Sequence, residues 1–297
     1  MSTRAGSRTG VVTAAALALL ALGCRKGLTD QGQIGAAVGE VMASADESAS
    51  GGSATAMLPA LPILRTPGEL KGPLWRRALD AVIPSAYAAD CYPFTYSACT
   101  SGVRTETFDS CSFGSATVDG SVTLTFSDTA ACSLSATSDS VDRTASFTLT
   151  GNYGGTLAVT SPGGGQTLTR TDGGFTFAVP GMERVLTAPG GRTLFDISTA
   201  TTTPLTITGS SRADFVIVSG TLVVTHNLAD YAVSLTPDNL AWTPSCNCAS
   251  SGSLTGTVTA GEDSGKSASV SITGCGTADV TIDGDTESVT LDRCAAI

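Results

Sequence analysis

The stretch "SVTLTFS", residues 121–127, decides the fold, because its apolar and polar residues alternate one by one. Side chains of a β-strand point to opposite faces in turn, so Val122, Leu124 and Phe126 share one face. Thr123 and Thr125 share the other, and threonine is a β-branched residue that suits the solvent side of a strand. The stretch therefore predicts a strand with one buried face and one hydrated face.

The same alternation recurs along the chain from about residue 100. It is present in "ASFTLTG", "GTLAVTS", "GFTFAVP", "PLTITG", "YAVSLTP", "ASVSITG" and "ADVTIDG". Between these segments lie turn-forming sequences rich in glycine, proline, aspartate and asparagine: "SPGGGQ", "TDGG", "APGGR", "TPDN", "AGEDSG" and "DGD". Short connections of this kind favour antiparallel neighbours, so the pattern predicts a meander.

We therefore predict an all-β fold, an antiparallel meander of about 14 to 16 strands that forms a sandwich or a curled, barrel-like sheet. Most of the predicted strands have five to seven residues. A membrane barrel is disfavoured, because it needs strands of about 9 to 11 residues and aromatic girdles, whereas this chain is 5% aromatic. The continuous apolar runs in "DFVIVSG" and "GTLVVTHN" predict strands in the middle of the sheet.

The segment before the strands predicts short helices and a linker. "GQIGAAVGEVMASA", residues 32–45, places Ile34, Val38, Val41 and Met42 on one helical stripe. "GPLWRRALDAVIP", residues 72–84, predicts a second helix that begins at a proline and stops before another. Between them, "SADESASGGSATA", residues 44–56, is small and polar, and we interpret it as a flexible tether.

The first residues predict export. Residues 1–10 carry two arginines and no acid, and they lead into a short apolar run that ends in Ala21-Leu22-Gly23-Cys24. This ending resembles the lipobox of bacterial lipoproteins, although leucine is more usual than Ala21. The resemblance implies cleavage before Cys24, acylation of Cys24 and a membrane partner reached through the acyl chains. In enteric bacteria an aspartate directly after the acylated cysteine favours retention in the inner membrane. The residue at this position is Arg25, which favours export to the outer membrane.

Three alternatives remain open for this region. The signal could be cut elsewhere without lipidation, or it could stay as a signal anchor. A second cleavage could also occur at "VIPSAYAAD", residues 82–90. Our organisation is a signal peptide over 1–23, a lipid anchor with linker and short helices over 24–90, and a disulfide-stabilised all-β domain over 91–297.

Cysteine usage agrees with an oxidising compartment. With Cys24 set aside, eight of the nine cysteines remain: Cys91, Cys99, Cys111, Cys132, Cys246, Cys248, Cys275 and Cys294. An even number in an exported chain predicts four disulfides, out of 105 possible pairings. Proximity in sequence favours Cys91 with Cys99, Cys111 with Cys132, and the last four among themselves.

Charge restricts the partners. The net charge is −10, and from Cys91 onward eight basic residues face 19 acidic ones. Such a surface repels phosphate backbones, so we expect no nucleic acid partner. We expect a protein, a glycan or an apolar ligand instead.

The sequence contains few residues that could form a catalytic or metal-binding site. His226 is the single histidine and reads as the polar end of a strand, and no nucleophile elbow occurs. Cys246 and Cys248 suit separate disulfides to Cys275 and Cys294 better than a metal. Asp283, Asp285 and Glu287 suit a hairpin turn better than a calcium loop. "SPGGGQTLTRT" precedes a strand pattern, so it is not a phosphate loop. We expect neither cofactor nor metal, and we name no catalytic residue.

The function that follows is a cell-envelope lipoprotein with a non-enzymatic binding or structural role. One alternative is a carrier of a lipid or other apolar ligand in the curled sheet. Another is a glycan-directed hydrolase, which would need two carboxylates with perturbed proton affinity in one cleft.

Overall fold

The structure is a computed structural model that describes residues 30–49, 97–113, 116–151, 154–291 and 294. Its elements follow one another as one helix and twelve strands. They are α2 (Asp30–Ala49), β1 (Val103–Phe113), β2 (Ala116–Phe126), β3 (Ser140–Thr150), β4 (Thr156–Thr171), β5 (Gly174–Thr187), β6 (Thr193–Thr208), β7 (Val216–His226), β8 (Tyr231–Trp242), β9 (Ala249–Ala260), β10 (Ser267–Gly274), β11 (Thr277–Ile282) and β12 (Asp285–Thr290). The predicted signal peptide, Cys24, Cys91 and the helix predicted within 72–84 lie outside the described residues.

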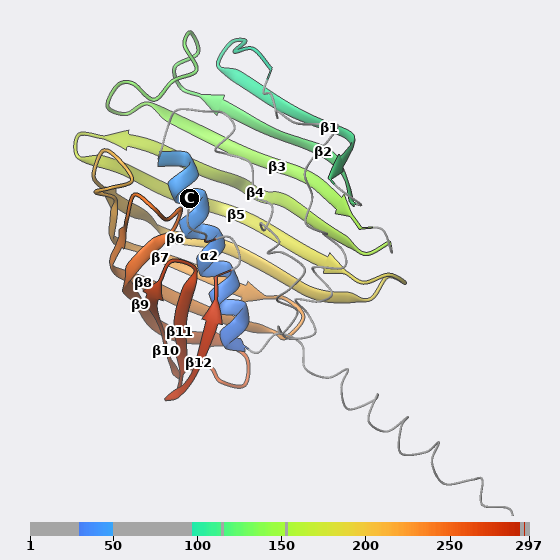
Figure 1. Ribbon diagram of the computed structural model, residues 1–297, viewed down its shortest axis with the longest axis vertical. Helices are drawn as coiled ribbons and strands as arrows, with labels where there is room; N and C mark the ends of the chain where they lie inside the picture. The colour runs from blue at the N-terminus through green and yellow to red at the C-terminus, as the bar shows by residue number, and fades with distance from the viewer. Residues whose placement is uncertain (1–29, 50–96, 114–115, 152–153, 292–293, 295–297) are drawn as a thin grey trace, which may run out of the picture.

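The strands form one antiparallel sheet whose spatial order is the chain order, β1 to β12. This confirms the predicted all-β meander. Of the two predicted forms, a sandwich and a curled sheet, the structure has the second, since its single sheet curls on itself without closing (Figure 1). The alternation in "SVTLTFS" holds, because Val122, Leu124 and Phe126 are buried in β2. The apolar run predicted to be central is β7, seventh of the twelve strands.

The strands are longer and fewer than predicted, with six to 16 residues each. Two predicted turns are wrong, because β4 runs through "SPGGGQ" and β8 runs through "TPDN". At both places the strand pairing shifts register instead of reversing direction. Such bulges bend a strand while it continues, so glycine and proline here mark a bend rather than an end.

Gly165 shows why the bend in β4 requires glycine. Its φ is +87°, and a Cβ on it would lie 2.0 Å from the carbonyl oxygen of Arg143 on β3. Register shifts occur near the middle of the pairs from β3–β4 to β6–β7 and again in β8–β9. A row of irregularities across neighbouring strands gives a sheet strong curvature.

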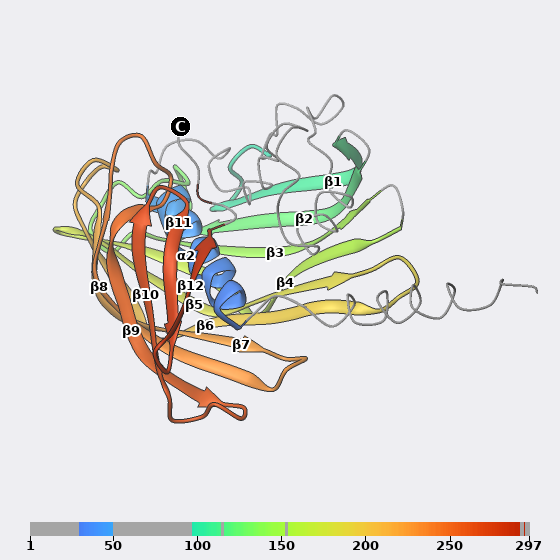
Figure 2. The ribbon, with the colours of Figure 1, turned by 60° about the horizontal axis from the view of Figure 1, so that its bottom comes forward.

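Helix α2 lies across the concave face of this sheet (Figures 1 and 2). The predicted stripe is confirmed, because Ile34, Val38, Val41 and Met42 are each at most 3% exposed. Ala37, Ala43 and Ala45 are buried too, so the helix is covered on more than one side. No helix in the described part of the chain combines the length and hydrophobicity that a membrane crossing requires.

The helix is longer than its predicted stripe and takes in the first six residues of the predicted tether. Residues 44–49 are helical, and Asp46 is only 1% exposed. The tether interpretation of this part is wrong, because composition alone did not show that Ala45 and Asp46 continue the buried surface. The rest of that segment lies outside the described residues.

Candidate functional site

Helix α2 packs closely against the end of the sheet, and two of its glycines make this close packing possible. A Cβ on Gly35 would lie 2.6 Å from Val289 Cγ2 on β12, and one on Gly39 would lie 3.1 Å from Leu291 Cβ. Leu291, just after β12, is fully buried. The helix backbone therefore packs directly against the last strand, with no room for larger side chains.

This contact yields a prediction about helix packing. We expect Gly35→Ala to destabilise the fold by about 1 to 2 kcal/mol, because the clash with Val289 outweighs the gain in helix propensity. Urea unfolding of Gly35→Ala, Val289→Ala and the double variant measures the coupling. The double variant should lose less stability than the two single losses together; simple additivity would contradict the contact.

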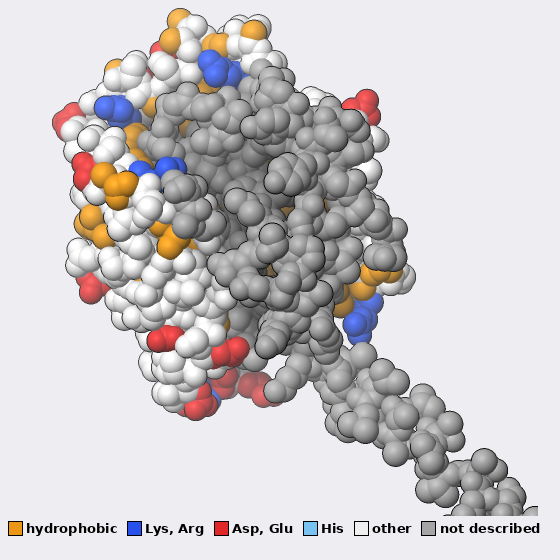
Figure 3. All heavy atoms as spheres, in the orientation of Figure 1, with side chains coloured by type: hydrophobic (Ala, Val, Ile, Leu, Met, Phe, Trp, Pro, Cys, Tyr) orange, Lys and Arg blue, Asp and Glu red, His pale blue; other side chains and the backbone are white. Residues whose placement is uncertain are grey.

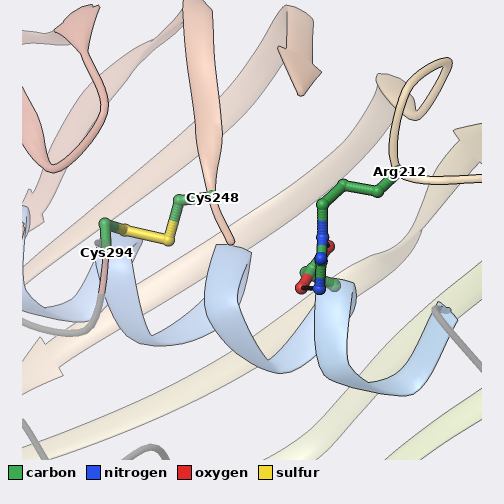
Figure 4. A network of polar contacts seen from close by, with 4 residues as sticks. Arg212, Cys248 and Cys294 are labelled. Atoms are coloured by element: carbon green, nitrogen blue, oxygen red, sulfur yellow. Dashed lines mark hydrogen bonds and ion pairs between the residues drawn. A yellow bond between two sulfur atoms is a disulfide. The ribbon is translucent and has the colours of Figure 1, made fainter. Parts of the chain in front are cut away.

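A disulfide adjoins the same part of the helix. Cys248, just before β9, is bonded to Cys294 near the end of the chain. Both sulfurs lie 3.8 Å from the carbonyl oxygen of Gly39, a packing contact, since a disulfide has no S–H to donate. Figure 4 shows this bond against the helix. It fixes Cys294 beside α2.

An ion pair holds the other end of α2. Arg212, in the loop between β6 and β7, donates from Nε to Asp46 Oδ1 at 2.7 Å and from Nη2 to Oδ2 at 2.6 Å (Figure 4). Burial raises the pKa of the Asp46 carboxyl, and the bonds from Arg212 oppose that rise. Asp46 in turn raises the pKa of Arg212. A bidentate pair of this geometry fixes both position and orientation.

A second buried polar group lies on the first strands. Glu106 on β1 is 3% exposed, and Arg143 on β3 donates to Gln166 Oε1 on β4 at 3.0 Å. Burial raises the pKa of Glu106 to about 7, although the positive charge of Arg143 opposes the rise. Glu106 is thus a buried carboxyl group that binds a proton near neutral pH.

This pKa predicts a pH-dependent stability. Between the ordinary value of 4.5 and about 7, the folded chain holds a proton that the unfolded chain has lost. The contribution of Glu106 to the free energy of unfolding is therefore fully present below pH 4.5. It decreases as the pH rises to about 7, by at most about 3 kcal/mol.

Glu106→Gln removes this titration and should unfold at higher urea than the parent chain at pH 8, with little difference at pH 4.5. Urea unfolding across this pH range makes the measurement, with Glu262→Gln at an exposed position as the matched control. If the free energy of unfolding changed with pH in the same way for the parent chain and Glu106→Gln, that result would contradict the raised pKa of Glu106.

The outer face of the sheet carries rows of hydroxyl groups. Thr105, Thr123 and Thr144 stand opposite one another on β1, β2 and β3, and the first two hydroxyls are 3.4 Å apart. A depression of about 350 Å³ opens beside them. Its lining is Ser121, Thr123, Thr144, Ala145, Ser146, Thr160, Ser161 and Pro162. Hydroxyls and small apolar groups can bind a polar partner by hydrogen bonds but supply no nucleophile paired with a base.

His226 is placed as the sequence predicted, at the end of β7. It is 6% exposed, and its Nδ1 accepts a hydrogen bond from the backbone N–H of Ala229 at 3.0 Å. The bond closes the turn that leads into β8. His226 therefore stabilises this turn.

The acidic candidates form the predicted hairpin. Asp283 and Gly284 both have positive φ, +51° and +91°, and Ile282 pairs with Asp285 across the turn. Positive φ at both central residues is typical of a two-residue hairpin turn. Within the described ranges, no group of three or more metal-binding side chains comes together.

The disulfides correct one part of the predicted pairing and confirm another. Cys99 is bonded to Cys132, so the predicted pairs Cys91 with Cys99 and Cys111 with Cys132 are wrong. The meander explains this, because Gly102, just after Cys99, accepts a backbone hydrogen bond from Phe126 at the end of β2, which brings Cys99 to the loop that holds Cys132. Cys111 is disulfide-bonded as well.

The last four cysteines pair among themselves as predicted. Cys246 is bonded to Cys275 and Cys248 to Cys294, which confirms separate disulfides for the two neighbouring cysteines. Their side chains are therefore not available as a metal-binding pair.

Sequence reasoning missed the two buried carboxyls. Asp46 lies in a polar stretch typical of a linker, and its partner Arg212 is 166 residues away. Glu106 does carry a local signal, because it occupies an inward position of the alternating segment "VRTETF" of β1. A charged residue on the apolar side of a strand marks a buried polar group.

Comparisons of the chain with protein families, with curated proteins and with solved structures found no match.

Proposed function

We propose that this chain is a lipid-anchored protein of the bacterial cell envelope, with a binding or structural role and no catalytic activity. The observation that carries the proposal is the position of α2, which occupies the concave face that a carrier or an enzyme with this sheet would use. Where α2 meets β6, β7, β8 and β9, the described residues leave an apolar cavity of about 10 Å³. A cavity of that volume is too small for a lipid or another apolar ligand.

Two further features support an envelope location. The cysteines are oxidised in three disulfides between described residues, as is usual in exported proteins. The sequence before Asp30 has the charged start, apolar run and terminal cysteine of a lipoprotein signal.

The carboxyls with raised pKa favour binding over glycan hydrolysis. Asp46 is held by Arg212 next to the β6–β7 loop, whereas Glu106 lies on β1 near the charge of Arg143. Both are buried, and they lie on different elements, α2 and β1. A hydrolase needs two carboxyl groups on either side of one open cleft.

The first test is acylation in a bacterial host. We expect the parent chain to incorporate labelled palmitate and to sediment with membranes, and Cys24→Ser to do neither. His226→Ala should behave like the parent chain. Equal membrane association of the parent chain and Cys24→Ser would overturn the anchor.

The second test separates the scaffold from the carrier. Protein purified in detergent, then extracted with organic solvent, should release no apolar molecule in a fixed ratio to the chain, because the acyl chains on Cys24 are covalently attached. An apolar molecule extracted in a one-to-one ratio from Cys24→Ser would support the carrier alternative and overturn the proposal.

A further inference from the structure

We infer that one end of the sheet, formed by the β9–β10 and β11–β12 turns, faces the lipid bilayer at short range. We call this surface, residues 261–266 and 283–285, the anchor end. The inference deepens the proposed function and rests on acylation of Cys24. Its occupant is the bilayer surface that holds those acyl chains.

Helix α2 has a defined direction relative to β12. Gly35 lies against Val289 and Gly39 lies against Leu291, so the helix runs in the same direction as β12. The start of α2 therefore points toward the start of β12 and the Asp283–Gly284 turn. Figure 1 shows the lower end of α2 next to β12 at this end of the sheet.

Polar contacts join the two turns. Lys266, at the end of the β9–β10 turn, contacts Asp263 Oδ1 at 2.7 Å and Asp283 Oδ2 at 3.4 Å. The backbone N–H of Asp283 also donates to the carbonyl of Ser267 at 3.0 Å. The two turns thus form one surface.

Only a short stretch of chain separates Cys24 from α2. Cys24 precedes the first residue of α2, Asp30, by six residues, and a chain of that length spans at most about 20 Å. Because α2 is packed between the sheet, the disulfide and Arg212, the helix cannot swing away from the domain. The start of α2 must therefore lie within about 20 Å of the headgroups, whatever the length of the linker after Ala49, and the anchor end is the end of the sheet nearest to it.

The orientation of the molecule follows from the other end of α2. Asp46 is 16 residues further along α2, about 24 Å from its start, and it holds the β6–β7 loop through Arg212. That loop lies at the opposite end of the helix. One end of the molecule thus faces the bilayer and the other faces away.

Charge sets how the anchor end meets the bilayer. The exposed residues Glu262, Asp283, Asp285 and Glu287 lie on or next to it, and Figure 3 shows acidic side chains gathered at the lower end of the molecule. Carboxylates are costly to bury in hydrocarbon. The anchor end therefore lies above the headgroups without inserting.

The test uses the acylated full chain in vesicles of phosphatidylcholine and phosphatidylethanolamine with a spin-labelled headgroup as quencher. A genetically encoded fluorescent amino acid replaces Glu262 at the anchor end or Ala213 in the β6–β7 loop. We expect at least twofold stronger quenching at 262 than at 213. Equal quenching, or stronger quenching at 213, would overturn the inference.

Two insertions of 20 Gly/Ser residues provide the matched control. Insertion after Gly27 should lower quenching at 262 to the level at 213, whereas the same insertion after Gly52 should leave it unchanged. A change caused by the Gly52 insertion would show that α2 does not set the distance. Failure of the acylated chain to bind vesicles would instead overturn the proposed function, so the two failures are distinguishable.

Discussion

Replacing Arg212 with alanine is expected to lower the free energy of unfolding by about 3 kcal/mol, because Asp46 would lose the cation that contacts both of its oxygens. Asp46 is 1% exposed in the parent chain, so its carboxylate depends on the guanidinium rather than on water. Arg212→Lys should recover only part of this loss, because an ammonium group cannot make the bidentate contact. Urea unfolding at pH 7 measures both effects.

The double variant Asp46→Leu with Arg212→Met is the control for this pair. Replacing both partners with apolar residues of similar size removes the charge and its burial cost together, so stability should return close to that of the parent chain. Equal stability of Arg212→Ala and the parent chain would contradict the structural role of the pair.

Removing the disulfide between Cys248 and Cys294 is expected to cost about 4 kcal/mol, because it closes a loop of 46 residues. The double replacement with serine should also expose α2, since both sulfurs lie against the carbonyl of Gly39. Thermal unfolding gives the loss of stability, and hydrogen exchange of residues 30–49 gives the exposure of the helix.

The matched control is the Cys99–Cys132 disulfide, which closes a loop of 33 residues near β1 and β2. Its removal should cost nearly as much stability, because the cost varies only with the logarithm of loop length. Exchange of α2 should rise less in this variant than in the Cys248–Cys294 variant. The same rise in both would contradict a direct role for Cys248 and Cys294 in holding the helix.

The β architecture could be predicted because it depends on local rules. Alternation in "SVTLTFS" identified a strand from neighbouring residues alone, and the Asp283–Gly284 hairpin followed from two residues that tolerate positive φ. Strand lengths could not be predicted in the same way. "SPGGGQ" and "TPDN" have turn composition, but the neighbouring strands hold them in bulges within β4 and β8.

The candidate site depends on long-range contacts, which one sequence does not reveal. The apolar stripe of α2 could be predicted from the sequence. The surface against which the helix packs could not, because it includes β12 and Leu291, about 250 residues later in the chain. Asp46 resembles a linker residue until Arg212 is placed beside it. The disulfide partners of Cys99 and Cys132 were likewise set by the meander, not by proximity in sequence.

The central claim is that α2 is a packed part of the sheet domain, and hydrogen exchange of the full-length chain tests it most directly. The account predicts that amides of residues 34–46 exchange as slowly as those of β7, through opening of the whole domain. Exchange of these amides within seconds, with β7 still protected, would show an undocked N-terminal segment and contradict the account.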